Sequence, residues 1–307
     1  MKIAFIFPGQ GSQAIGMGKD LYSQAPKARS LLEEASDALS YDMKTLLFEP
    51  NDLLEQTEFT QPAIFTVSAM ALEVFKQGCS LFPSFALGHS LGELTALYAA
   101  KAISFEKGVR LVNKRGKLMR EACQNLEVGM MAVLGLEDEK VEALCASSLE
   151  KGGRVWPANY NSPGQVVIAG VRQDLVALES TMKEAGAKRV LILNMSIASH
   201  CPLLLPACKP LIENLHEDVD KYFDFPIVSN VTAKAYKSKD EAVKLLGEQL
   251  IKPVLYKQSI EANDEDIEIY IEFGGSVLKG LNRRISKKPT YCITDMSSLE
   301  ETLKLMQ

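Results

Sequence analysis

A serine between two glycines is the first candidate for chemistry in this sequence. Ser90 lies at the centre of a Gly-x-Ser-x-Gly pattern at 88–92, between an apolar run at 85–87 and helix-forming residues at 93–101. On a tight strand-to-helix turn, small neighbours let the bend close and the serine hydroxyl projects from the sheet edge. The main-chain N–H of Leu91, at the positive end of the helix, would then face a developing oxyanion. The pattern predicts a nucleophilic serine, and chance occurrence of the pentapeptide is the alternative.

A serine nucleophile needs a base, and the sequence has three histidines. His89 lies inside the turn, where its side chain should point away from that of Ser90, and His216 has the pattern of an exposed helical residue. Elimination leaves His200 as the candidate base. A triad would also need an acid, but no Asp or Glu between Ser90 and His200 stands out.

A second glycine-rich loop follows the predicted strand 2–7. Residues 9–14 match the relaxed dinucleotide-binding fingerprint Gly-x-Gly-x-x-Ala. Residues 30–40 have helical spacing, however, where that fold needs a second strand ending in an acid, so dinucleotide binding is not favoured. Such a loop also lets the backbone approach a reacting carbonyl. We therefore predict the main-chain N–H of Gln10 as the second oxyanion donor.

Two predicted helices bring polar side chains toward this site. The helix predicted at 105–122 has an apolar face that includes Gly116, and the neighbouring Arg115 could turn its guanidinium inward. For most basic residues of this helix, a solvated charged face is the simpler interpretation. Gln249, near the end of the helix predicted at 239–251, could face the pocket at His200, and an exposed glutamine is the alternative.

The order of elements predicts an α/β fold in two parts. We expect a large α/β-hydrolase-like domain, residues 1–123 and 196–307, in which a parallel sheet carries the nucleophile elbow. From residue 128 the order becomes β-α-β-β-α-β, which predicts an inserted ferredoxin-like subdomain at 124–195 and a substrate cleft between the two. The remaining expected elements are helices at 60–77, 138–151, 172–186 and 276–285 and strands at 129–136, 154–160, 165–170, 188–194, 224–230 and 267–273.

Composition excludes several classes of protein. The chain has 307 residues and a net charge of −5, which argues against a nucleic-acid binder. The six cysteines are scattered without a C-x-x-C pair, so neither a metal site nor a disulfide framework is expected. Free thiols, and the absence of a signal-peptide pattern or a bilayer-length apolar stretch, favour the cytoplasm and no membrane contact.

A set of motifs resembles those of the malonyl-CoA:acyl-carrier-protein transacylases, the acyltransferases of bacterial type II fatty acid synthesis. The resemblance covers essentially the whole chain. The motifs are FPGQGSQ at 7–13, TQPA at 60–63, GHSLGE at 88–93, RGKLM at 115–119, ANYNSPGQVVIAG at 158–170, SH at 199–200 and QLIKPV at 249–254.

The resemblance implies a ping-pong transfer without a cofactor. A malonyl group would pass from malonyl-CoA to Ser90 and then to the phosphopantetheine thiol of acyl carrier protein. His200 would be the general base, held by the main chain and a glutamine, here Gln249, which accounts for the missing acid. The guanidinium of Arg115 would hold the malonyl carboxylate through two charge-assisted hydrogen bonds and so select malonyl over acetyl.

Other implications of the resemblance are less specific. Asn159 and Asn161 would line the cleft, and the chain is expected to be a monomer. Selection of malonyl over methylmalonyl rests on the whole-chain resemblance, because residues 197–199 differ among relatives that use other extender units. A basic patch could dock the acidic carrier protein, although a solvated face explains it equally well. That patch consists of Lys188, Arg189, Arg283 and Arg284.

Two other functions remain compatible with the same residues. A thioesterase or esterase would use the same elbow with water as the acceptor and would not need Arg115. A non-catalytic module that binds carrier protein would form no covalent adduct at Ser90. The reactivity of Ser90 and the substrate preference of an Arg115 variant separate these alternatives.

Overall fold

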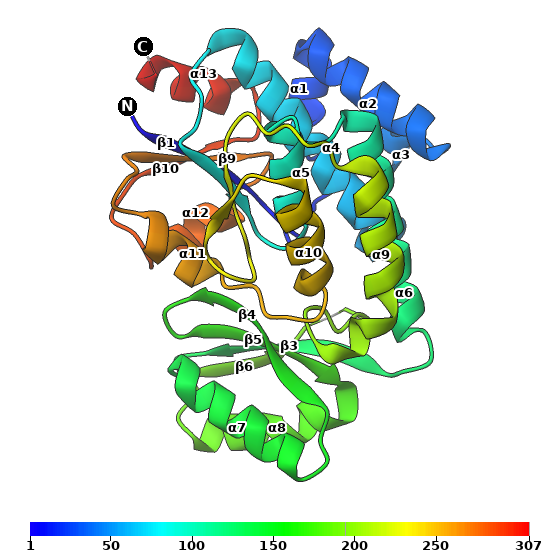
Figure 1. Ribbon diagram of the computed structural model, residues 1–307, viewed down its shortest axis with the longest axis vertical. Helices are drawn as coiled ribbons and strands as arrows, with labels where there is room; N and C mark the ends of the chain where they lie inside the picture. The colour runs from blue at the N-terminus through cyan, green and yellow to red at the C-terminus, as the bar shows by residue number, and fades with distance from the viewer. Residues whose placement is uncertain (194, 307) are drawn as a thin grey trace.

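The chain folds around two β-sheets of different character (Figure 1). The structure is a computed structural model that describes residues 1–193 and 195–306. The larger sheet has the order β10-β9-β1-β2-β7-β8, in which all neighbours are parallel except β7 and β8. Its strands are β1 (Ile3–Phe7), β2 (Phe85–Gly88), β7 (Ile227–Val228), β8 (Ala235–Tyr236), β9 (Ile269–Phe273) and β10 (Thr290–Ile293). The predicted α/β class with a parallel sheet is confirmed.

The central strands are short apolar runs because both faces of the sheet are covered. Phe5 and Phe7 of β1 pack on one side, in the core shared with helix α4 (Thr57–Gly78), and Ile6 packs on the other, with Tyr256. Since β1 and β2 are parallel neighbours with Phe7 opposite Gly88, the loops that follow both strands leave the same sheet edge. This register brings the two glycine-rich loops together.

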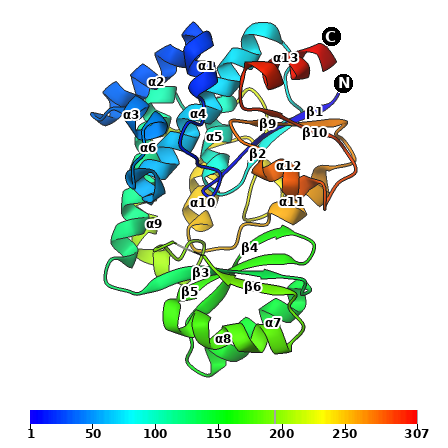
Figure 2. The same cartoon turned by 180° about the vertical axis from the view of Figure 1, so that it is seen from behind.

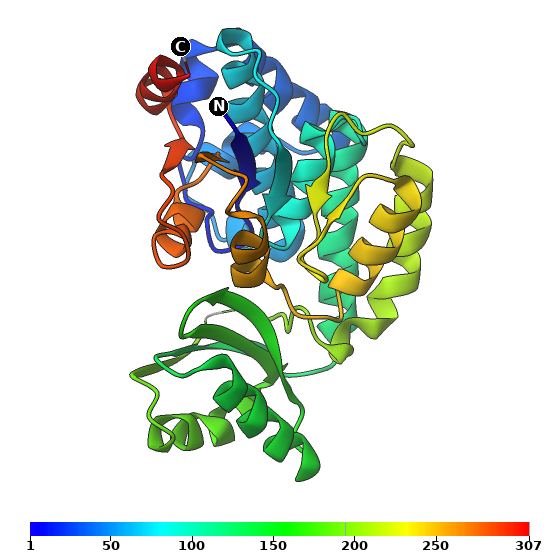
Figure 3. The same cartoon turned by 60° about the vertical axis from the view of Figure 1, so that its left-hand side comes forward.

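Helices cover both faces of this sheet (Figure 3). Helices α6 and α9 pack against each other, and α6 also packs on α4. The helices of this part are α1 (Lys19–Gln24), α2 (Pro26–Leu39), α3 (Met43–Phe48), α4 (Thr57–Gly78), α5 (Leu91–Ala99), α6 (Phe105–Cys123), α9 (Leu205–Asp218), α10 (Lys239–Gln249), α11 (Tyr256–Asn263), α12 (Val277–Asn282) and α13 (Met296–Leu305), with 3₁₀ turns η1 (Leu53–Glu55) and η2 (Pro202–Leu204). None of the described helices is long and apolar enough to cross a membrane.

The smaller sheet is antiparallel, with the order β4-β5-β3-β6 (Figure 2). Its elements follow the predicted sequence β-α-β-β-α-β, and α7 and α8 pack on this sheet around a separate apolar core. They are β3 (Val128–Leu134), α7 (Asp138–Glu150), β4 (Val155–Ser162), β5 (Gln165–Val171), α8 (Arg172–Glu184) and β6 (Arg189–Ile192). Position 194, the end of the strand predicted at 188–194, lies outside the described residues. The domain boundaries at 123/124 and 195/196 stay a prediction.

Several predicted boundaries are wrong, and one has a clear physical reason. Helix α4 begins at Thr57 rather than at residue 60, so Pro62 lies inside it instead of near its start. Proline has no N–H to donate to the carbonyl four residues earlier, which is that of Glu58. The side chain of Asn113 on α6 donates to this carbonyl instead, at 2.7 Å. Other wrong limits are those of the strand predicted at 224–230, which is Ile227–Val228, and of the helix predicted at 276–285, which is Val277–Asn282.

Candidate active site

Ser90 lies on a strained turn between β2 and α5. Its backbone has φ 54° and ψ −106°, a conformation that residues other than glycine rarely adopt. A Cβ atom on Gly88 would lie 1.9 Å from the carbonyl carbon of Gly92, and one on Gly92 would lie 2.0 Å from the main-chain oxygen of Phe7. Both glycines are therefore required by close backbone approach. The predicted strand–turn–helix context of the serine is confirmed.

Asn230, in the loop after β7, holds this turn in place. The N–H of Ser90 donates to Asn230 Oδ1 at 2.7 Å, and Asn230 Nδ2 donates to the carbonyl of Gly88 at 2.6 Å. One fully buried side chain thus fixes the backbone on both sides of position 89. Sequence reasoning missed Asn230, although it ends a predicted strand at the same sheet edge as Ser90.

His200 is oriented as a base toward Ser90. Its Nε2 lies 2.8 Å from Ser90 Oγ, and its Nδ1 lies 2.7 Å from the main-chain carbonyl of Gln249. Because a carbonyl can only accept, Nδ1 carries the proton and Nε2 is free to accept one from the serine. Burial, reinforced by the charge of Arg115, lowers the pKa of His200 to about 3. The ring is therefore neutral at pH 7. The group that orients it, in the place of a triad acid, is a carbonyl instead of a carboxylate.

The side chain of Gln249 is buried, so the alternative of an exposed glutamine is wrong. Its Nε2 faces three acceptors, the carboxylate of Glu93 at 2.8 Å, the carbonyl of Ser90 at 3.1 Å and Asn230 Oδ1 at 3.2 Å. Its Oε1 accepts from Arg115 Nη2 at 3.0 Å. This amide therefore connects the serine turn to the carboxyl group of Glu93 and to the guanidinium of Arg115.

The guanidinium of Arg115 is turned inward, as its position beside Gly116 suggested, and the side chain is 1% exposed. Nη1 donates to Gln61 Oε1 at 2.7 Å, and Nη2 lies 3.1 Å from Ser90 Oγ. Nε has no hydrogen-bond partner, and Arg115 forms no ion pair with a described Asp or Glu. Burial lowers the pKa of Arg115 to about 10, opposed by the charge of Glu93, so the group is cationic at pH 7. A buried cation without an anionic partner in contact can bind an anion.

Close packing of α6 on α4 explains how Arg115 reaches the serine. A Cβ atom on Gly116 would lie 2.6 Å from the Cα of Glu58, so a larger residue would push the helices apart. Lys114 and Lys117 remain exposed on the opposite face, as the amphipathic pattern predicts. Gln61 is a partner that residue-level reasoning missed, although it lies within the TQPA motif.

The two predicted oxyanion donors line one narrow cavity with the predicted nucleophile and base. This cavity has a volume of about 50 Å³, and Gln10, Leu91, Ser90, Arg115 and His200 contribute to its wall. The N–H groups of Gln10 and Leu91 donate to no described residue, so both are available to a ligand. The loops approach closely because position 9 is glycine, where a Cβ atom would lie 2.3 Å from the carbonyl of His89.

The two asparagines predicted to line the cleft have different environments. Asn159 lies in the wall of the cavity. Asn161 Oδ1 lies 2.8 Å from Nε2 of His89, whose ring also packs against Tyr256 at a centroid distance of 5.6 Å. The imidazole of His89 is thus held away from the serine hydroxyl, as expected, and Asn161 contacts it instead of Ser90.

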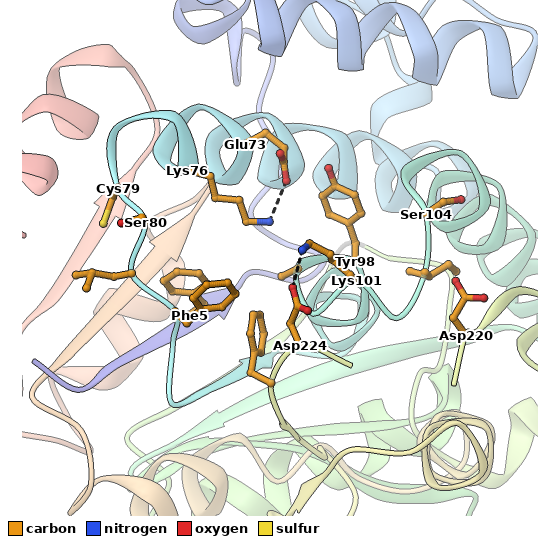
Figure 4. Close-up of a pocket in the computed structure, with 15 residues that line it drawn as sticks. Phe5, Glu73, Lys76, Cys79, Ser80, Tyr98, Lys101, Ser104, Asp220 and Asp224 are labelled. Atoms are coloured by element: carbon orange, nitrogen blue, oxygen red, sulfur yellow. Dashed lines mark hydrogen bonds and ion pairs between the residues drawn. The ribbon is translucent and has the colours of Figure 1, made fainter. Parts of the chain in front are cut away.

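A larger cavity of about 590 Å³ lies at the other end of α5, away from these groups (Figure 4). Both of its lysines are paired with acids: Lys76 pairs with Glu73 at 3.0 Å, and Lys101 pairs with Asp224 at 2.9 Å. Aromatic and aliphatic side chains make up most of the remaining wall. The cavity offers neither an activated nucleophile nor an unpaired cation. Size alone therefore does not mark the reactive site in this molecule.

Comparisons with known proteins agree with this geometry. Residues 4–273 match the acyl transferase domain family. The malonyl CoA-acyl carrier protein transacylase of Bacillus subtilis is 40% identical over 310 residues, which cover 100% of this chain and 98% of that protein. The Escherichia coli K12 protein of the same name is 40% identical over 92% of this chain and 93% of its own length. The chain belongs to the malonyl-CoA:acyl-carrier-protein transacylase family.

Solved structures of transacylases share the whole fold. The malonyl-CoA:acyl carrier protein transacylase of Helicobacter pylori superposes with a TM-score of 0.96 at 47% identity, covering 100% of this chain and 98% of that one. A malonyl-transacylase in complex with a type II polyketide acyl carrier protein gives 0.96 at 38% identity, covering 99% of this chain and 100% of that one. The chain is therefore an acyltransferase. In the described residues, no group of His, Cys, Asp and Glu could hold a metal ion.

Proposed function

We propose that the chain transfers a malonyl group from malonyl-CoA to the phosphopantetheine thiol of acyl carrier protein, through an ester on Ser90. The reaction supplies malonyl units for fatty acid synthesis. The observation that supports the proposal best is the buried guanidinium of Arg115, which lies 3.1 Å from the serine hydroxyl and forms no ion pair with a described acid. An acyl group with a carboxylate at its far end fits this arrangement, because the ester and the anion would then be bound side by side.

In the first half-reaction, His200 Nε2 takes the proton of Ser90 Oγ as the oxygen attacks the thioester carbonyl. The N–H groups of Gln10 and Leu91 stabilise the resulting oxyanion. The C–S bond then breaks, and the imidazolium gives its proton to the departing CoA thiolate. The positive charge on His200 is transient, which fits a site whose burial and nearby arginine favour the neutral ring.

Arg115 holds the malonyl carboxylate during both half-reactions. Nε and Nη2 share one edge of a guanidinium, and that edge can form two parallel hydrogen bonds with a carboxylate. Here Nε has no partner, and the two N–H groups of Nη2 face Ser90 Oγ and Gln249 Oε1, so the second hydrogen bond to the carboxylate replaces the one to Ser90 Oγ. An acetyl group would leave this buried donor unfilled, which disfavours acetyl transfer.

In the second half-reaction the carrier thiol gives its proton to neutral His200 and attacks the ester carbonyl, and Ser90 leaves as the proton returns to its oxygen. Water competes with the thiol at this step, so the ester must be shielded. Three methionines, Met119, Met130 and Met195, line the narrow cavity beside the serine. Their apolar side chains support transfer to a thiol over hydrolysis.

The finer description of the fold belongs to the same proposal. A nucleophile after a parallel strand, with its base late in the chain, supports an α/β-hydrolase-like large domain at 1–123 and 196–307. The order β4-β5-β3-β6 supports a ferredoxin-like subdomain at 124–195. We further propose a cytoplasmic monomer that requires no cofactor.

The carrier protein is proposed to dock on the basic patch of Lys188, Arg189, Arg283 and Arg284. All four side chains are exposed, and Arg284 Nη2 lies 3.4 Å from the carbonyl of Pro163, between β4 and β5. The patch thus includes residues from both parts of the molecule. Charge reversal of Arg189 and Arg284 should raise the KM for carrier protein and leave that for malonyl-CoA unchanged. Two unchanged KM values would remove the patch from the proposal.

Intact mass spectrometry after mixing with malonyl-CoA tests the reaction. One malonyl group should appear on the wild-type chain, map to the peptide that contains Ser90, and be absent from the Ser90→Ala variant. No adduct on the wild type would favour a non-catalytic binding module. An adduct released by water as fast as by carrier protein would favour a thioesterase.

A further inference from the structure

A buried carboxylate lies beneath the reactive serine and has no part in the reaction steps above. Glu93 occupies the first turn of α5, three residues after Ser90, and is 0% exposed. One of its oxygens, Oε2, accepts from the main-chain N–H of Asn230 at 2.9 Å and from Gln249 Nε2 at 2.8 Å. The carboxylate therefore connects the helix of the nucleophile to the loop after β7 and to the end of α10. Removing a charge from water is costly, so its burial here calls for a role.

The contact with Gln249 fixes which way that amide points. A glutamine amide has two nearly equivalent orientations, and its surroundings select one of them. Here a carboxylate lies on one side of the amide and a guanidinium on the other. With Nε2 toward Glu93, the oxygen faces Arg115 Nη2 at 3.0 Å, and both contacts are favourable. The reversed amide would set oxygen against carboxylate and NH₂ against guanidinium.

The carboxylate is the strongest of the groups that select this orientation. Two neutral oxygens also face Gln249 Nε2, the carbonyl of Ser90 at 3.1 Å and Asn230 Oδ1 at 3.2 Å. Glu93 is closer, and above its pKa of about 7 it is ionised and forms a stronger hydrogen bond than a neutral acceptor. The carboxylate also anchors Asn230, which is itself one of those two partners.

We propose that Glu93 is a positioning residue for malonyl selection, which acts on Arg115 through the amide of Gln249. The inference rests on the proposed function, in which Arg115 binds the malonyl carboxylate. With the amide fixed, its oxygen holds Nη2, while Gln61 holds Nη1 at 2.7 Å from the other side. The guanidinium is thereby aligned before substrate arrives, and the unpartnered Nε stays free for the carboxylate.

Substitutions at Glu93 separate the hydrogen-bond acceptor from the charge. Glu93→Gln keeps an oxygen that can accept from both N–H groups, whereas Glu93→Leu removes both acceptors at a similar volume. The readout is the ratio of malonyl to acetyl adducts on Ser90 when the two CoA thioesters compete. Because this ratio does not depend on the fraction of folded enzyme, a purely structural defect leaves it unchanged. Glu272→Leu, which removes another fully buried carboxylate, is the matched control.

The proposal predicts a loss of selectivity for one Glu93 variant and little change for the other. Glu93→Leu should lower the malonyl-to-acetyl ratio by about tenfold, through a higher KM for malonyl-CoA. This is the loss expected when a misaligned Arg115 forms one charge-assisted hydrogen bond fewer with the malonyl carboxylate. Glu93→Gln should stay within about threefold of the wild type, and the Glu272 control should not change the ratio. A wild-type ratio in Glu93→Leu, or an equal loss in both Glu93 variants, would overturn the proposal.

A double variant tests whether Glu93 acts through Gln249. Gln249→Leu keeps the carbonyl that holds His200 and removes the amide, so it should lower the ratio by itself. In that background Glu93→Leu should have no further effect on the ratio. Independent, additive losses would contradict the proposed route. A wild-type ratio in Arg115→Ala would instead refute the proposed function, and loss there together with a wild-type ratio in Glu93→Leu would refute this inference alone.

A measurement on folded protein covers the case in which Glu93→Leu does not fold. Burial raises the pKa of Glu93 to about 7, and the facing groups titrate elsewhere: the pKa of Arg115 on α6 is about 10, that of Tyr236 on β8 is raised well above 10, and that of His200 is about 3. The NMR signals of the Gln249 side-chain amide, identified by their loss in Gln249→Leu, should shift between about pH 6 and 8. They should not shift in Glu93→Gln. No shift in the wild type would overturn the proposal.

Discussion

Replacing Arg115 by lysine keeps the buried charge and removes the planar fork. The guanidinium contacts Gln61 Oε1 at 2.7 Å and Gln249 Oε1 at 3.0 Å, and a single ammonium nitrogen cannot reproduce this spread of donors. A lysine would offer the malonyl carboxylate one hydrogen bond in place of two. Since a hydrogen bond to a charged group contributes about 1.5–3 kcal/mol, the substitution should lower malonyl selectivity by roughly 10–100-fold.

Competition between malonyl-CoA and acetyl-CoA measures this loss directly. Equal concentrations are mixed with enzyme, the reaction is quenched before turnover, and the two adducts on Ser90 are counted by mass spectrometry. Arg115→Lys should lose malonyl adduct while the rate of acetylation stays within about threefold of the wild type. The control is Arg110→Lys on the same helix, where the guanidinium is exposed and pairs with Glu106. An unchanged ratio in Arg115→Lys would refute the two-bond argument.

Three further predictions concern the base and the turn. His200→Ala should slow acylation by malonyl-CoA by about 10²–10⁴-fold in stopped-flow assays, and a loss below about tenfold would exclude general-base catalysis by this ring. The pH profile is best measured in a Glu93→Gln background, because the pKa of Glu93 is about 7 and its titration would overlap the range of interest. In this background kcat/KM for acylation should stay flat from pH 8 to about pH 5. The reason is that the neutral, active form of His200 persists above its pKa of about 3, whereas an acid limb near pH 6.5 would contradict the lowered pKa. Gly92→Ala should lower stability by about 1–3 kcal/mol or more, seen as a lower Tm in calorimetry, because the new methyl group would collide with the main chain of Phe7. Gly280→Ala, on a helix with no atom near the added carbon, is its control, and equal Tm values for the two variants would count against the close approach.

The local parts of the site could be predicted from the sequence. The turn at Ser90 follows from two glycines, an apolar run before them and helix formers after them, all within a few residues. Arg115 could be placed because the helix pattern and Gly116 together allow an inward guanidinium. In both cases the physical cause, close backbone approach, is encoded by neighbouring residues.

The support of the site could not be predicted, because it depends on which segments meet. Asn230 and Gln249 reach the serine only when β7 pairs with β2 and α10 packs beneath the turn, and no local pattern encodes these contacts. Glu93 lies in the recognised motif, but helix periodicity does not reveal that its carboxylate is buried against Asn230. The start of α4 was misplaced because Pro62 is normally a helix-start signal, and the donor that compensates for it lies on another helix.

The central claim is that a serine ester beside a buried arginine carries a malonyl group to a thiol. A single-turnover chase tests it most directly: malonyl-enzyme is isolated free of CoA and incubated with or without phosphopantetheinylated acyl carrier protein. The account predicts that the ester persists in buffer and disappears on addition of the carrier, which gains one malonyl group. Loss of the ester at the same rate in buffer alone, or a carrier that remains unmodified, would contradict it.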